Sequence, residues 1–380
     1  MNRRIALLSP NFQAKSETWI WRQINYLKPH ISFVGVQQPV PSNHNLNIPV
    51  KNLLAIPNIK TRIINKIKKT PYNHQLLIEY NLNNLEKSTG FNTYYIHYLT
   101  QAYQLKERLL KTSKDIFIHC HGYDVTWDFR SLEYPFDYIY DEDYKDFARK
   151  IQNKAIFIAN SEYTKENIKS IGISPEKIKV LRFGTEIVNP KEKKRSPFKI
   201  LYLGRLVDCK GPHKTIEAFD KACELGMDAE LIIAGDGPLM STIRIIKNKS
   251  KYSDRIKILG PVTFEQGKKL RDECHVFTTH NMTGELTNQI EAYGVSFIEA
   301  LMHGMPVVTG DSGGIPEIVK HNEVVFLFEP GNIEQHAKYL FQLYKDQNLL
   351  YRLSKKSNKF AKYNFNTEQE INTLNEILNL

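Results

Sequence analysis

Short apolar runs alternate with longer amphipathic segments along this chain, and this alternation constrains the fold more than any other feature. RIALLSP, ISFVGVQQ, TYYIHYL, DIFIHCHG and AIFIANS are β-branched or aromatic runs that end at turn residues, as strands do. Between them lie helical patterns such as SETWIWRQINYLK, with Ser16 or Glu17 near its start. Strands that alternate with helices build parallel sheets from βαβ units. We therefore expect an α/β fold of the doubly wound kind.

The alternation stops once and then starts again. Residues 188–199, VNPKEKKRSPFK, are charged, contain two prolines and lack core periodicity, which is typical of a linker. New strand candidates follow in KILYLGRLV, AELIIAGDGP, IKILGPV, HVFTTH and PVVTG. A chain of 380 residues is also long for a single core. We expect an N-terminal domain (1–187), the linker, a C-terminal domain (200–365) and a last helix (366–380) that packs back on the first domain.

Positive charge is concentrated in the first half of the chain. The formal net charge is +11, and residues 1–190 hold 26 Lys and Arg against 17 Asp and Glu. No acidic residue lies between Glu17 and Glu79. Such a surface favours an anionic partner, which could be a membrane face, a lipid-linked phosphate or a nucleic acid. Because the sequence has no helix-turn-helix, zinc spacing or aromatic RNA-binding run, we do not expect a nucleic-acid partner.

One basic segment, IPNIKTRIINKIKKTPY at residues 56–72, allows two interpretations. Its isoleucines recur at helical spacing and lysines fill much of the rest. Such a helix can lie on an anionic membrane surface, or it can be an ordinary surface helix with its isoleucines in the core.

The compartment is also suggested by the sequence. The start, MNRRIALLSPNF, is typical of a first strand rather than a signal peptide, and no apolar run reaches the ~20 residues of a membrane span. Four cysteines without metal spacing suggest reduced thiols: Cys120, Cys209, Cys223 and Cys274. We expect a cytoplasmic protein. The membrane interpretation of residues 56–72 would place it at the inner face of the plasma membrane.

LYLGRLVDCKGPHKTI, residues 201–216, is the first candidate for ligand binding. A strand ends at Gly204, Arg205 follows, and Lys210 precedes a helix start. Glycine lets backbone approach a ligand, helix starts offer N–H groups, and both cations can hold phosphate oxygens. The alternative is a solvated loop with two cations.

AGDGPL, residues 234–239, brings Gly235 and Gly237 to another strand end. A plain turn between strand and helix explains this piece by itself. Because the pattern is not GxGxxG, an NAD-linked enzyme or a nucleotide-sugar epimerase is disfavoured.

Two glutamates distinguish the stretch EAYGVSFIEALMHGMPVVTGDSGGIPE at residues 291–317. Glu291 lies in a loop that leads through Gly294 into a helix, and Glu299 falls near the beginning of that helix. Carboxylates accept hydrogen bonds from paired hydroxyls of a ribose or a sugar. Either glutamate alone could instead be solvated or stabilise the helix dipole.

Two further clusters contain titratable residues. In HCHGYD, His121 ends a strand and could bond a substrate hydroxyl or assist proton movement, whereas His119 lies on the same strand face and could be the relevant residue instead. Asp141, Glu142 and Asp143 could bind a divalent metal, but they read better as an exposed acidic helix start. We expect no metal.

Together, GRL-x3-KG, GDGPL, the glutamate pair, and A-x-x-x-G-x-PVV followed by GG-x-PE resemble the retaining family 4 glycosyltransferases of GT-B fold. Residues 160–186 resemble the family's segment that leads out of the first domain, and SETWIWRQINYL with HGYD is similar to bacterial members that build exopolysaccharide, capsule or O-antigen chains. The resemblance implies two Rossmann-like domains that face each other across a cleft. It also implies hexosyl transfer from a nucleotide sugar, a UDP-sugar, to a lipid-linked or growing glycan.

The resemblance also implies roles for individual residues. Arg205 and Lys210 would hold the diphosphate, Glu291 would contact the donor sugar, and Glu299 would hold the ribose hydroxyls. His121 would lie beside the transferred sugar. The implied catalytic set is His121, Arg205, Lys210 and Glu291, and the implied donor-binding set is Gly204, Arg205, Lys210, Gly235, Gly237, Glu291, Tyr293, Gly294, Val295, Ser296 and Glu299. No cofactor or metal is expected besides the donor.

The chain departs from the family pattern at two pairs of residues. Thr279-His280 stands where Pro-Ser is frequent, and Thr185-Glu186 replaces the more usual Val-Asp. These departures leave the donor sugar and base open. Separately, a non-catalytic nucleotide-sugar-binding protein that assists a partner enzyme stays open as an alternative.

Overall fold

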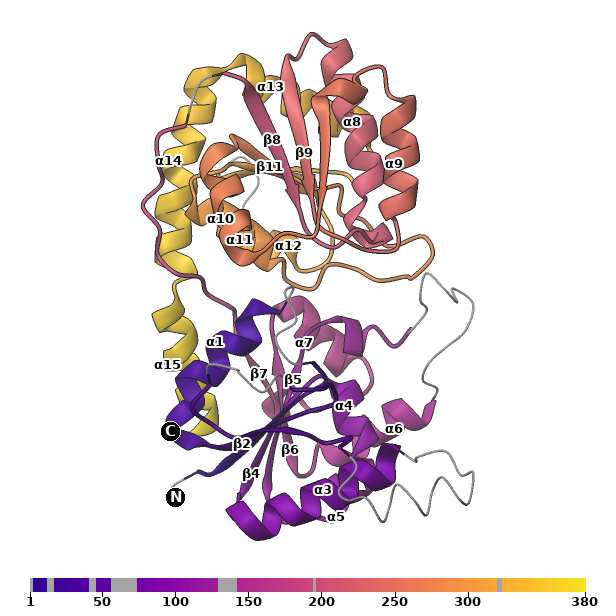
Figure 1. Ribbon diagram of the computed structural model, residues 1–380, viewed down its shortest axis with the longest axis vertical. Helices are drawn as coiled ribbons and strands as arrows, with labels where there is room; N and C mark the ends of the chain where they lie inside the picture. Colours follow the sequence, from indigo (N-terminus) through magenta and orange to yellow (C-terminus); the bar gives the residue numbers. More distant parts are fainter. Residues whose placement is uncertain are drawn as a thin grey trace.

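Two parallel sheets, one in each half of the chain, organise the computed structural model of this protein (Figure 1). The α/β expectation is confirmed. The structure describes residues 3–11, 17–40, 46–55, 74–128, 142–193, 196–319 and 323–380.

The N-terminal domain is built on a seven-stranded sheet in the order β3-β2-β1-β4-β5-β6-β7. Its strands are β1 (Ile5–Ser9), β2 (Ile31–Val36), β3 (Val50–Asn52), β4 (Thr93–His97), β5 (Asp115–Cys120), β6 (Ala155–Ala159) and β7 (Ile178–Val180). The helices are α1 (Thr18–Leu27), α3 (His74–Thr89), α4 (Leu99–Gln104), α5 (Lys106–Lys111), α6 (Glu142–Ile151) and α7 (Glu162–Lys169).

The C-terminal domain repeats this plan on a six-stranded sheet in the order β10-β9-β8-β11-β12-β13. Its strands are β8 (Phe198–Leu203), β9 (Ala229–Ala234), β10 (Ile256–Gly260), β11 (Val276–Thr278), β12 (Val307–Gly310) and β13 (Val325–Phe328). The helices are α8 (Pro212–Glu224), α9 (Met240–Lys249), α10 (Phe264–Glu273), α11 (Val295–Met302), α12 (Ile315–Ile318), α13 (Ile333–Lys345), α14 (Gln347–Asn364) and α15 (Thr367–Leu378). Because β8 begins at Phe198, the strand takes in the last two residues of the expected linker.

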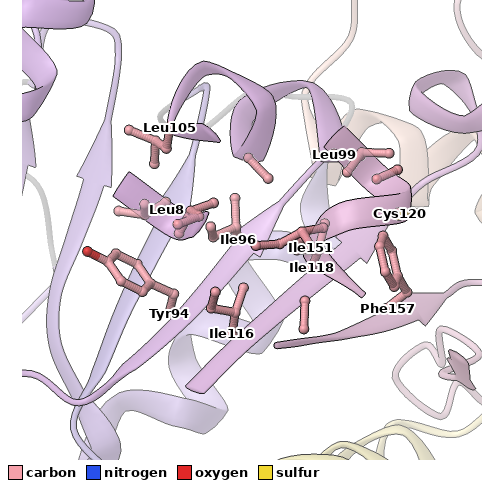
Figure 2. Packing of buried hydrophobic residues seen from close by; sticks show 14 of the residues in the cluster. Leu8, Tyr94, Ile96, Leu99, Leu105, Ile116, Ile118, Cys120, Ile151 and Phe157 are labelled. Atoms are coloured by element: carbon pink, nitrogen blue, oxygen red, sulfur yellow. The ribbon is translucent and has the colours of Figure 1, made fainter. Parts of the chain in front are cut away.

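Side chains alternate between the two faces of the N-terminal sheet, and this decides where the polar residues go. Ile116, Ile118 and Cys120 of β5 point into one core, as Figure 2 shows for this strand and its neighbours. Phe117 belongs to the cluster on the opposite face, and the period of two puts His119 on that face as well. Both faces are covered, so the strands read as nearly continuous apolar runs.

The last helix, α15, leaves the C-terminal domain and lies beside α1 of the N-terminal domain (Figure 1). Leu374 and Leu378 belong to the same buried cluster as Ile5 and Leu7 of β1. Glu370, which is 2% exposed, accepts hydrogen bonds from the Gln23 side chain (3.0 Å) and from the backbone N–H of Gly184 (2.9 Å). The C-terminus of the chain thus completes the core of the first domain.

Some expectations fall partly or wholly outside the described residues: the basic segment at residues 56–72, Asp141, Ser16 and residues 194–195 of the expected linker. Glu142 and Asp143 lie in the first turn of α6, where Glu142 pairs with Lys145 and Asp143 pairs with Lys106. Within the described part of the chain, no helix has both the length and the apolar character needed to cross a membrane.

Candidate active site

Lys210 and Glu291 meet in the C-terminal domain at the end of the sheet that faces the other domain. Lys210 lies in the loop after β8, and Glu291 lies in the loop before α11. The Lys210 ammonium group donates directly to Oε2 of Glu291, and the two side chains are only 12% and 15% exposed. Burial by itself would raise the pKa of Glu291, but the Lys210 and Arg205 charges outweigh it and lower that pKa. Glu291 is therefore a fixed, ionised carboxylate at neutral pH.

Arg205 supplies a second cation near this pair. It directly follows the Gly204 turn after β8, and it is exposed. Its charge acts on Glu291 and also on the phenol of Tyr98 in the N-terminal domain. Arg205 therefore lies near Glu291 and near Tyr98 of the other domain, in a place where a cation could hold an anionic ligand.

The start of α11 offers backbone donors beside these cations. Gly294, with φ +92°, precedes the helix, and Val295 and Ser296 are its first residues. The first N–H groups of a helix have no partner within the helix and favour an anion. Tyr293, which is expected in the nucleotide-sugar site, lies just before Gly294, and its buried hydroxyl donates to the backbone oxygen of Phe183 (2.8 Å).

The glycines of AGDGPL are explained by packing. A Cβ at Gly235, where φ is +141°, would lie 1.9 Å from the backbone oxygen of Gly204. A Cβ at Gly237 would lie 2.7 Å from the backbone oxygen of Leu206. The turn after β9 therefore needs glycine in order to lie against the Arg205 loop, whether or not a ligand also requires it.

Glu299 lies in the second turn of α11, so it does not stabilise the helix start by its charge. Its carboxylate pairs with the guanidinium of Arg271 on α10, and the Arg271 side chain is buried. A hollow of about 20 Å³ lies against this pair, lined by Thr185, Glu186, Val188, Phe264, Lys268, Arg271, Glu299 and His303. A cavity of about 660 Å³ lies elsewhere, between the linker and α10, and none of the expected site residues line it.

His121 occupies the facing edge of the N-terminal domain, just after β5. Its ring lies 4.5 Å from the Tyr98 ring, 6.0 Å from the Trp19 ring and 5.9 Å from the Phe183 ring, measured between centroids. Burial, with the neighbouring His119 and His97, holds the pKa of His121 well below its usual value. The imidazole is therefore neutral at pH 7, as a hydrogen-bonding group or general base must be.

Three histidines, His97, His119 and His121, place nitrogen atoms within 4.8 Å of one another. Nδ1 of His97 and Nε2 of His121 already share a hydrogen bond (3.1 Å), and Nδ1 of His119 bonds the Tyr95 hydroxyl (2.9 Å). The rings lie within 28° of parallel, so their in-plane lone pairs do not converge on one point. The cluster fits a hydrogen-bonded stack better than a set of metal ligands.

The two halves of the site touch. A Cβ at Gly122, next to His121, would lie 2.1 Å from Cβ of Ala292, next to Glu291. Asn288 also donates from its side chain to Asp128 of the first domain (3.0 Å). His121 and the Lys210–Glu291 pair therefore border the same interdomain space.

Some residues of this site carry no sequence signal that we recognised. Arg271 is the partner of Glu299, and an arginine on a helix gives no hint of that role. Asp208 accepts hydrogen bonds from the backbone N–H groups of Leu286 and Thr287 (3.0 Å each), which fixes the long polar loop before Glu291. Its place between Arg205 and Lys210 is the only clue that sequence offered.

The C-terminal half of the chain is similar to a known protein family. Residues 184–363 match the family described as glycosyl transferases group 1. This match covers a little under half of the chain and includes most of the C-terminal sheet domain. The matched residues include Arg205, Lys210, Glu291 and Glu299, whereas His121 lies outside the match.

Curated relatives extend the similarity to polysaccharide biosynthesis. The amylovoran biosynthesis glycosyltransferase AmsK of Erwinia amylovora is 27% identical over 246 residues, which cover 64% of this chain and 58% of AmsK. A GDP-mannose-dependent phosphatidylinositol monomannoside mannosyltransferase of Mycobacterium tuberculosis is 28% identical over 148 residues, 39% of this chain and 38% of that protein. The matched segments thus span roughly two fifths to three fifths of these relatives.

Solved structures confirm the two-domain GT-B architecture. HepE of Anabaena, in complex with UDP-glucose, superposes with a TM-score of 0.77 at 18% identity over 99% of both chains. Sucrose-phosphate synthase of Thermosynechococcus elongatus gives 0.78 at 16% identity over 99% of this chain and 98% of that one. At these identities the likeness concerns the fold.

Proposed function

We propose that this protein is a retaining, metal-independent glycosyltransferase that moves a hexosyl residue from a UDP-sugar to a lipid-linked or growing surface glycan. The observation that carries the proposal is the Lys210–Glu291 pair, with Arg205 beside it, opposite a neutral His121 across the interdomain space. The glycosyltransferase group 1 match and the AmsK relative support it. The HepE complexes with UDP and UDP-glucose support the choice of base.

The chemistry follows from the charges. Breaking the bond between the sugar and the nucleotide leaves negative charge on the departing diphosphate. Two cations, the exposed Arg205 and the paired Lys210, together with N–H groups at the start of α11, would stabilise that charge where it develops. A metal ion would be redundant for this task.

The remaining groups would position the reactants. Glu291, which Lys210 holds in place, would accept hydrogen bonds from donor-sugar hydroxyls, and Glu299 would accept those of the ribose. The stack around His121 would hold the imidazole neutral beside the acceptor, where it can bond a hydroxyl of either sugar.

A ligand screen followed by a turnover assay tests this proposal. Melting temperature is measured with UDP-, GDP-, ADP- and dTDP-sugars, with and without EDTA, since a ligand that binds the folded state raises it. We expect the largest shift from a UDP-sugar, unchanged by EDTA, and release of UDP. The matched variants are Arg205→Ala, Glu299→Ala and, as a control on the exposed face of α9, Arg244→Ala.

The outcomes separate the candidates. Loss of UDP release in the first two variants, with the Arg244 control unchanged, supports transfer chemistry at this site. Full activity in both Arg205→Ala and Glu299→Ala refutes it. Donor binding with no turnover under any condition would favour the non-catalytic nucleotide-sugar-binding protein. A shift that EDTA abolishes would overturn metal independence.

The same proposal places the protein in the cytoplasm, at the inner face of the plasma membrane, where a lipid-linked acceptor would lie. The support is the run from Glu17 to Glu79, which contains basic residues and no acidic residue between these two. Flotation with anionic and neutral vesicles checks it, and equal recovery with both would reject membrane docking.

A further inference from the structure

The two domains are joined by a carboxylate that caps a helix of the opposite domain. Glu317 of α12, in the C-terminal domain, accepts a hydrogen bond at Oε2 from the backbone N–H of Glu162 (2.7 Å) and one at Oε1 from that of Tyr163. These are the first two residues of α7 in the N-terminal domain. Figure 1 shows α12 and α7 at the boundary between the domains.

The local chemistry favours this contact. Ser161, the residue before α7, caps only one N–H group of its own helix, that of Thr164 (3.0 Å). Glu162 and Tyr163 are left without a partner inside the helix, and a helix start attracts negative charge. Arg182 adds a cation 3.9 Å from Oε2 of Glu317. Bonds from N–H groups to an ionised carboxylate are among the stronger ones.

On the side of the C-terminal domain, the segment that carries Glu317 is packed on the Glu291 loop. The N–H of Gly314 donates to the backbone oxygen of Glu291 (2.9 Å). A Cβ at Gly314 would lie 2.0 Å from the backbone oxygen of Ala292, so no side chain fits there. A shift of Glu317 should therefore displace the loop that holds Glu291.

On the side of the N-terminal domain, the start of α7 is tied to His121. Asn160, two residues before the helix, donates from its side chain to the backbone oxygen of His121 (3.2 Å). The contacts thus form a continuous path from His121 through Asn160, α7, Glu317 and the Gly314 turn to Glu291.

We propose that Glu317 is an interdomain positioning residue, whose carboxylate caps α7 and thereby holds the His121 loop and the Glu291 loop together across the cleft. The inference rests on the proposed function for the roles of His121 and Glu291. Glu317 itself touches neither reacting group. In a protein with the domains apart, both Glu317 and the start of α7 would be solvated, so the contact acts on closure rather than on folding of either domain.

The test uses full-length Glu317→Ala and Glu317→Gln, with Glu334→Ala on α13 as a control glutamate of the same domain. Hydrogen exchange is measured for the peptide that contains Glu162 and Tyr163. UDP affinity is measured by calorimetry, and kcat by UDP release from whichever UDP-sugar the wild type turns over fastest. For Glu317→Ala we expect hydrogen exchange in this peptide to be roughly 10-fold faster and kcat to be roughly 10-fold lower, with UDP affinity unchanged. Glu317→Gln retains one acceptor, so its exchange rate and kcat should lie between those of Glu317→Ala and the wild type. Glu334→Ala should match the wild type in both.

Three results would overturn the inference. Equal exchange in wild type and Glu317→Ala means that the cap does not exist in solution. Faster exchange with an unchanged kcat means that the cap does not position the loops. A parallel fall in UDP affinity places Glu317 in the donor site instead. A wild type with no turnover would count against the proposed function, and the exchange result would still report on the cap.

Discussion

The ammonium group of Lys210 contacts the carboxylate of Glu291 directly, although 81 positions separate the two residues in sequence. Neither strand order nor helix pattern predicts such a pair. It exists because β8 lies at the centre of its sheet and the loops after β8 and before α11 reach the same edge. The pair explains why Glu291 stays ionised although it is buried.

Replacing Lys210 by alanine should affect both activity and stability. Loss of one charge-stabilising group at the diphosphate should lower the rate of UDP release about 100-fold or more. Glu291 would be left buried without its cation, which should lower the free energy of unfolding by about 1–3 kcal/mol. Urea denaturation and a UDP-release assay measure the two effects, with Lys251→Ala as an exposed control.

A second substitution separates these effects. Lys210→Ala combined with Glu291→Gln removes the unpaired charge, so part of the lost stability should return while activity stays low. If the double variant were no more stable than Lys210→Ala, the buried charge would not be the cause of the destabilisation.

Substitution of His121 by alanine should act on the rate and spare nucleotide binding. The ring belongs to the N-terminal domain, whereas Arg205, Lys210 and Glu299 lie in the other, so UDP affinity should be unchanged. Loss of a positioned proton-transfer or hydrogen-bonding group should lower kcat about 100-fold. His74→Ala, on the exposed side of α3, is the control. A matching loss of UDP affinity would place His121 in the nucleotide site.

The fold was largely predictable because its signals are local. The run TYYIHYL became β4 and DIFIHCHG became β5, since a strand buried on both faces needs a continuous apolar run. The seven- and six-stranded parallel sheets follow from the same alternation of strands and helices. Strands β3, β7 and β13 were not expected; β3 and β7 have only three residues, which give no periodicity, although the equally short β11 was expected from HVFTTH.

The site was less predictable because its partners are distant in sequence. Glu299 was recognised through its spacing from Glu291, but its contact with Arg271 depends on how α10 packs beside α11. Glu317 was visible within GGIPE, but the contact with α7 crosses the domain boundary. Spacing shows which residues share a segment, and it cannot show which segments meet.

Stability should fall as the pH falls below about 6.5, because buried histidines resist protonation. Burial, with the neighbouring Lys214 and His213, lowers the pKa of His280 to about 3, whereas an unfolded histidine titrates near 6.5. Between these values the unfolded chain binds more protons, so the free energy of unfolding drops with falling pH by about 1.4 kcal/mol per unit for each such group. Stability from His280 is fully present above 6.5 and is lost as the pH approaches 3.

His280→Gln tests this origin, since its side chain can still accept from the Gly331 N–H that bonds His280 in the wild type (3.1 Å). From pH 7 to pH 5 the variant should lose about 2 kcal/mol less than the wild type, measured by urea denaturation at each pH. His74→Gln, at an exposed position, should follow the wild-type curve. Identical pH dependence in His280→Gln would show that other groups dominate.

The packing of α15 on the N-terminal domain predicts that a change near the end of the chain destabilises its beginning. Leu374 is 1% exposed and lies in the same cluster as Ile5 and Leu7 of β1. Leu374→Ala should leave a cavity there and cost about 2–5 kcal/mol. Hydrogen exchange should therefore accelerate in β1, which is more than 360 positions away in sequence. Leu225→Ala, at a position that is 50% exposed, should leave exchange in β1 unchanged. If Leu374→Ala accelerated exchange only within α15 itself, the helix would be a separate appendage and the first domain would be stable without it.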